Sequence, residues 1–197
     1  SMNKLYIAGI DEIPRRVTLE DNDELHLTIV CPPGYSGDIN FRIDLLRPGV
    51  KLDMAGLSFC ALGERQTFNV QVHHKVGGAV SRQLFKSIVG EKGRANFNGL
   101  IYVAPDAGKT KAYQESHSLL LSEGAVSESH PELEIYTDDV ECSHGSTIGY
   151  LNADERFYMQ SRGIPEEEAV RLQILSFLSP VLNRLPEEKR KALINRL

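Results

Sequence analysis

The chain has 197 residues, of which 41% are hydrophobic and 25% are charged, a balance typical of a folded domain and not of a disordered segment. Its formal net charge of -5 and the lack of a Lys/Arg run argue against a nucleic-acid-binding surface. The sequence has no apolar run of membrane-spanning length, no signal-peptide pattern, and three cysteines without a Cys-x-x-Cys pair. These features predict a cytoplasmic protein with reduced thiols.

Segments with the signals of β-strands fill the chain from Leu5 to about Ile148. They are β-branched or alternate apolar and polar side chains, and glycines and prolines separate them. Helical signals begin only after Gly149, so we expect a β core over residues 3–149 and a helical segment over residues 150–197. The expected strands are Leu25–Val30, Ile39–Ile43, Phe68–His73, Leu84–Val89, Phe97–Val103, Ser118–Leu121, Leu133–Tyr136 and Val140–Cys142.

Two architectures, a β-sandwich and a β-helix, are compatible with this strand pattern. A sandwich needs tight hairpins, and Asn98-Gly99 is the dipeptide most typical of one. The run before Asn98 is too short for a strand, however, so the hairpin interpretation is poor. A β-helix stacks similar coils, but the sequence shows no strict repeat. Periodicity alone therefore leaves both architectures open.

The candidate site lies in the stretch from Pro131 to Gly149. After a polar corner at residues 137–139, the chain resumes as an extended segment in which Val140, Cys142 and His144 share one face. A thiol and an imidazole two residues apart can converge on one transition-metal ion. Two ligands do not close a site, so the others must come from another rung or another chain. The alternative is that both side chains are simply buried inside the coil.

Other polar groups receive plainer interpretations. His73 and His74 should point to opposite faces of a strand, so they cannot share one ion, and we expect one of them to be exposed. Lys109 lies in a segment that resembles a phosphate loop but lacks the upstream glycine, so a turn is predicted. Carboxylates near the candidate site, and two further histidines, are interpreted as solvent-exposed: Asp138, Asp139, Glu141, His117 and His130.

Three short helices are expected at the C-terminus. Asn152 or Asp154 can cap the first, and Gly163 ends it. Pro165 starts the second, which Pro180 should kink or break, and Pro186 starts the third. The second helix has two apolar stripes, so one side should pack on the β core and the other on a partner. The stripes are Leu172, Leu175, Leu178 and Leu182, and Val170, Ile174, Phe177 and Val181.

Three runs of this sequence closely resemble the SufB/SufD family of iron–sulfur cluster assembly proteins. They are PELEIYTDDVECSHGSTIG, its continuation ERFYMQSRGIPEEEA, and FNGLIYVAPDAGKTKAYQESHSLLLSEGA, and the resemblance covers at least Val72 to Leu185. The Cys-Ser-His-Gly run makes the SufD type the better match. The resemblance implies a right-handed parallel β-helix and decides between the two architectures. Family members carry a helical region before the β-helix, so this chain is expected to be a short homologue or an excised core.

The resemblance also implies a function. SufD-type proteins are proposed to pair the histidine that corresponds to His144 with a cysteine of a SufB-type partner where a transient iron–sulfur cluster is built, which would make Cys142 a supporting thiol. The family's other partner is a SufC-type ABC ATPase, expected to dock on Val170, Ile174, Phe177 and Val181. The chain is then a non-enzymatic scaffold that pairs with a SufB-type paralogue or forms a homodimer. The alternatives are a purely structural solenoid that positions the ATPase and, ranked last, a metal-dependent enzyme.

Overall fold

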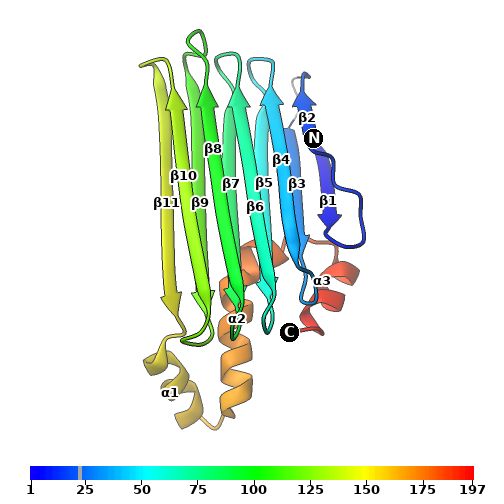
Figure 1. The fold of residues 1–197 in the computed structure, drawn as a ribbon, viewed down its shortest axis with the longest axis vertical. Coiled ribbons are helices and arrows are strands. Elements are labelled where there is room, and N and C mark those ends of the chain that lie inside the picture. The colour runs from blue at the N-terminus through cyan, green and yellow to red at the C-terminus, as the bar shows by residue number, and fades with distance from the viewer. Residues whose placement is uncertain (22–23) are drawn as a thin grey trace.

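The computed structural model describes residues 1–21 and 24–197, in which eleven strands form two parallel sheets and three helices follow (Figure 1). The strands are β1 (Met2–Ile7), β2 (Arg16–Leu19), β3 (Glu24–Cys31), β4 (Gly37–Leu45), β5 (Lys51–Cys60), β6 (Arg65–His74), β7 (Val80–Val89), β8 (Arg94–Val103), β9 (Thr110–Leu120), β10 (Val126–Ile135) and β11 (Val140–Tyr150). Sheet A has the order β1-β3-β5-β7-β9-β11, and sheet B has the order β10-β8-β6-β4-β2. Consecutive strands alternate between the sheets, which makes a solenoid of about five turns.

Each coil repeats the register of the coil before it. Along sheet A, for example, one row of paired residues runs through Leu25, Leu52, Ser81, Ala112 and Cys142. Because side chains alternate between the two faces of a strand, every second row points into the space between the sheets. The predicted parallel β-helix is confirmed, and Asn98-Gly99 lies inside β8 instead of in a hairpin turn.

All eight predicted strands coincide with or overlap observed ones, but β1, β2 and β5 were not predicted. The omission of β5 has a physical reason. Nearly all of its residues are buried, on the outer face of sheet A as well as on the inner face. A strand covered on both sides lacks the apolar–polar alternation by which strands are recognised.

The helices are α1 (Ala153–Ser161), α2 (Glu166–Leu182) and α3 (Glu187–Ile194). Asn152 caps α1 by accepting a hydrogen bond of 2.9 Å from the backbone N–H of Glu155, as predicted. Gly163 follows this helix with φ of +90°, a conformation that glycine adopts without strain. In the part of the chain that the structure describes, no helix is long and apolar enough to cross a membrane.

Pro180 does not break α2, which continues to Leu182. A proline removes the backbone N–H that would bond the carbonyl four residues earlier, here that of Ser176. The hydroxyl of Ser179 donates a hydrogen bond of 3.0 Å to this carbonyl oxygen. The helix therefore keeps a donor at this position and ends only two residues after the proline.

The two apolar stripes of α2 are not divided between the core and a partner as expected. Ile174 and Val181, placed on the outward stripe, are buried against the outer face of sheet A together with Leu178 and Leu182. Val170 and Phe177 are half-buried at the same contact. The expectation that this stripe faces away from the core is therefore wrong, because the helix rests in a broad apolar surface formed by β3, β5 and β7.

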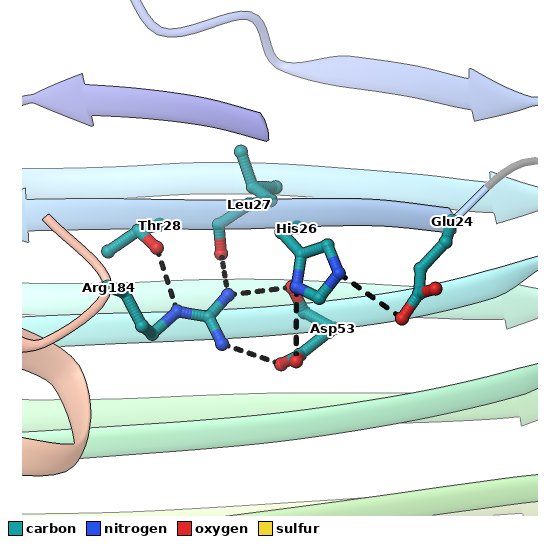
Figure 2. Close-up of polar contacts among 6 residues, drawn as sticks. All are labelled: Glu24, His26, Leu27, Thr28, Asp53 and Arg184. Atoms are coloured by element: carbon teal, nitrogen blue, oxygen red, sulfur yellow. Dashed lines mark hydrogen bonds and ion pairs between the residues drawn. The ribbon is translucent and has the colours of Figure 1, made fainter. Parts of the chain in front are cut away.

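A polar clamp fixes the end of α2 to the first coils (Figure 2). The guanidinium of Arg184 donates to Asp53 Oδ1 at 2.7 Å, to the carbonyl oxygen of Asp53 at 2.8 Å, to Thr28 Oγ1 at 2.9 Å and to the carbonyl oxygen of Leu27 at 3.2 Å. His26 lies beside this clamp, with its Nδ1 3.3 Å from Asp53 Oδ2. One side chain thus holds the C-terminal helices on two adjacent strands.

Candidate functional site at the last coil

The last coil consists of β10 and β11, which stand at the ends of their sheets (Figure 1). Among the described strands, β11 pairs only with β9, and β10 pairs only with β8. Most residues of β11 are consequently exposed, including every residue from Ser143 to Ile148. The strand that carries the candidate site therefore has one hydrogen-bonding edge open.

Cys142 and His144 continue two rows of the solenoid interior. Cys142 pairs with Ala112 and His144 pairs with Gln114, both of which are buried. Cys142 packs against an interior apolar cluster that includes Ile101. His144 is exposed, because no further coil covers its row. The structure thus brings the two predicted ligands to one face at the open end.

The Cys142 side chain is half-buried, and this burial raises the pKa of its thiol, although a backbone hydrogen bond from Ala112 offsets part of the effect. A thiol binds metal as the thiolate, so a metal ion at this position must displace a proton. Metal binding through Cys142 is therefore expected to strengthen as the pH rises.

The neighbouring carboxylates do not converge on this pair. Asp138 and Asp139 are exposed in the corner between β10 and β11. Glu141 lies on the opposite, outer face of β11, where its carboxylate accepts a hydrogen bond of 2.8 Å from the hydroxyl of Tyr113. The predicted solvated corner matches this placement. Lys109 lies in the adjacent turn, as expected, with its backbone N–H bonded to the carbonyl of Asp139.

The remaining histidines are elsewhere. His73 and His74 point to opposite faces of β6 as predicted, but both are buried, so the expectation that one is exposed is wrong. The ring of Tyr102, one coil later, stacks on His73 and covers it. His130 is exposed, whereas His117 is half-buried and hydrogen-bonded to Thr147. Over residues 1–21 and 24–197, no group of three or more His, Cys, Asp or Glu side chains could hold a metal ion.

Sequence reasoning missed two interior glutamines beneath His144. Gln114 pairs with His144, and Gln83 pairs with Gln114 one coil further in. Each glutamine occupies an inward-facing position of its own strand, because the residues on either side of it point to the outer face. Aligning the coils by their strands would have placed both in the row of His144, but no strict repeat is visible in the sequence.

The fold and the last strand define a class of protein: a parallel β-solenoid whose open end presents a thiol and an imidazole. Residues 14–177 match the family described as SUF system FeS cluster assembly, SufBD core domain. This match covers most of the chain, which therefore belongs to the SufBD family.

Curated relatives agree with this assignment. The chain is 43% identical to the iron–sulfur cluster assembly protein SufD of Escherichia coli over 120 residues, which cover 61% of this chain and 28% of that protein. It is 37% identical to SufD of Bacillus subtilis over 125 residues, 64% of this chain and 29% of that protein. It is 36% identical to the chloroplastic protein ABCI7 of Arabidopsis thaliana over 178 residues, 88% and 37% of the two chains. The SufD-like resemblance is thus confirmed, and the chain spans about a third of the length of these relatives.

Proposed function

We propose that this chain is a scaffold subunit of a SUF-type iron–sulfur cluster assembly complex that contributes His144 and Cys142 where the cluster is built. The placement of His144 carries this proposal: it stands at the open end of a SufBD-family solenoid, on a strand with a free edge. Iron–sulfur clusters take thiolate and, in some cases, imidazole ligands. The cluster is cargo in this proposal, and the chain catalyses no bond-forming reaction itself.

A second chain has to complete such a site. Two side chains are fewer than the four ligands of a typical closed site, and the free edges of β10 and β11 can pair with another strand. The second chain is a SufB-type paralogue or a second copy of this one. In either case the interface forms over the last coil, and His144 lies within it.

Anaerobic reconstitution of the whole complex with iron and sulfide tests this role. The variants His144→Ala and Cys142→Ala should lower the yield of assembled cluster about tenfold or more. Ser143→Ala is the matched control, because Ser143 lies between the two ligands on the opposite face of β11. Unchanged assembly with both ligand variants would favour the second candidate function, a purely structural solenoid that only positions the ATPase.

We further propose that a SufC-type ABC ATPase docks on the α1–α2 hairpin. Figure 1 shows α1 and the first part of α2 extending beyond the ends of the strands. Large apolar side chains are exposed on these helices, with Phe157 72% exposed and Leu172 41% exposed. Large exposed apolar side chains on two helices that contact each other favour a protein contact. This surface replaces the stripe expected from the sequence, most of which the solenoid covers.

Copurification tests the docking surface. Phe157→Ser with Leu172→Ser should abolish copurification of the ATPase without changing the unfolding of the solenoid. Tyr136→Ser, at an exposed aromatic residue far from the helices in the fold, is the control. Ile174→Ser is unsuitable, because it would disturb the packing of α2 on sheet A. Retained binding by the soluble double variant would refute this surface.

A cytoplasmic location remains a prediction that fractionation of the native cells can test.

A further inference from the structure

One interior row of sheet A changes from apolar to polar side chains toward the open end. It runs through Leu27, Met54, Gln83, Gln114 and His144, each paired with the next. Lys4 of β1 begins this row at the exposed first strand, Leu27 and Met54 are apolar, the next two members are amides and the last is the candidate ligand. Gln83 is 3% exposed and Gln114 is 2% exposed, so both amides are inside the solenoid.

These two amides lack the partners that buried polar groups normally have. Within the described part of the chain, Nε2 of Gln114 and both polar atoms of Gln83 have no hydrogen-bond partner. Buried polar atoms in native proteins are nearly always bonded, and an exception calls for an explanation. Other buried glutamines do bond their amide nitrogen: that of Gln66 donates to three carbonyl oxygens, and that of Gln173 donates to the carbonyl of Asn152.

Gly99 keeps space for the Gln114 amide. A Cβ atom at Gly99, on the facing sheet, would lie only 2.5 Å from Nε2 of Gln114. A side chain at this position of β8 would therefore displace the amide. Asn98-Gly99 is a dipeptide typical of turns, but here it lies inside β8, where the missing side chain of Gly99 leaves space for the Gln114 amide.

We propose that Gln114 is a positioning residue of the His144 site and that Gln83 supports it; this rests on the proposed function of His144. Paired residues on adjacent strands lie about 4.8 Å apart, which is within reach of both side chains. A histidine that binds metal through one ring nitrogen carries a proton on the other and needs an acceptor for it. The side-chain carbonyl of Gln114 accepts that N–H, and the Gln114 amide donates in turn to the carbonyl of Gln83. This series of hydrogen bonds uses Nε2 of Gln114 and Oε1 of Gln83, two of the three unpartnered atoms, and fixes the tautomer of His144.

Titration of the chain with Zn²⁺ tests the proposal, because Zn²⁺ is diamagnetic and takes thiolate and imidazole ligands. Gln114→Met keeps the volume of the side chain but removes its acceptor. It should lower the affinity for Zn²⁺ about 10- to 100-fold. In ¹⁵N NMR of the zinc-loaded protein, His144 should lose its single tautomer. Gln114→Glu should restore both, since a carboxylate also accepts the ring N–H.

The controls separate the possible failures. Met54→Leu changes the same row far from His144 and should leave zinc affinity unchanged. Weaker zinc binding with His144→Ala but unchanged binding and tautomer with Gln114→Met would overturn this proposal alone. Unchanged binding with His144→Ala would overturn the proposed site as well.

Discussion

The first and last coils of the solenoid share one backbone pattern but differ in what fills them. Between the sheets, the first coils are packed with apolar side chains such as Leu27, Ile29, Ile43 and Leu52. In sheet A these rows end in polar or small residues, and His144 closes one of them, whereas the row of Ile43 in sheet B ends in the half-buried Leu133. Because parallel strand pairing is the same in both regions, the difference lies in the side chains. Apolar packing is therefore concentrated in the early coils from β3 onward, and the last coil is left exposed.

The outer face of sheet A also differs between the early coils and the last coil. Over β3, β5 and β7 it is covered by α2, and Arg184 clamps the end of that helix to the first two of these strands. No described helix packs on β11, whose outer residues are exposed or glycine. The helices thus reinforce the region that is already the most apolar inside.

Truncation of one interior row at an early coil and at its last coil tests this comparison most strongly. Ile43 and Leu133 belong to the same row of sheet B, through Val72 and Ile101, but only Ile43 is fully buried. Ile43→Ala should lower the free energy of unfolding by about 2–5 kcal/mol, because it leaves a cavity in a packed core. Leu133→Ala should cost clearly less. Urea denaturation of both variants measures this, and equal losses would contradict the division.

The comparison also explains what could be predicted from the sequence. The apolar–polar alternation identified most strands, and caps and glycines located α1 well. Features set by contacts between segments far apart in the sequence could not be predicted: α2 covers the outer face of β5, and Tyr102 covers His73. The face of α2 that packs on the solenoid could not be chosen, since both stripes are apolar. Spacing and resemblance selected Cys142 and His144 as candidate ligands, but the amides in the row of His144 could be placed only with the register between coils.

Acid should weaken the middle of the solenoid. Burial, together with the nearby His73, lowers the pKa of His74 from its ordinary value of 6.5 to about 4. Burial, followed by Arg42, lowers that of His73 similarly. Above pH 6.5 both histidines are neutral in the folded and in the unfolded chain. Between pH 6.5 and pH 4 the unfolded chain binds protons at these histidines and the folded chain does not, so the free energy of unfolding falls as the pH is lowered through this range. For His74 the loss amounts to about 3 kcal/mol. His74→Asn should flatten the pH profile of denaturation midpoints, whereas His130→Asn, at an exposed position, should not.

The Arg184 clamp should contribute less than the core. Arg184→Met removes four hydrogen bonds, including a charged one to Asp53, and should lower the free energy of unfolding by about 2 kcal/mol. Lys191→Met, which breaks only an exposed pair with Glu187, should change it by less than about 0.5 kcal/mol. Hydrogen exchange of the amides of α2 should show the same difference between the variants. Equal protection in the two variants would mean that apolar packing alone holds the helix.

The open end should have the smallest effect on stability and the largest effect on association. The edge of β11 offers unpaired backbone groups, and such edges recruit other strands unless they are covered. Without another partner, the chain should form a two-fold dimer through its last coils, with both copies of His144 near the interface. Ser146→Lys places a charge in the row beyond His144 and should give a monomer at micromolar concentration in sedimentation, while shifting stability by only a few tenths of a kcal/mol. Glu20→Lys, outside the last coil, should leave the dimer intact. A monomeric parent chain would show that the edge is already blocked, and would remove the main reason for expecting a partner over His144.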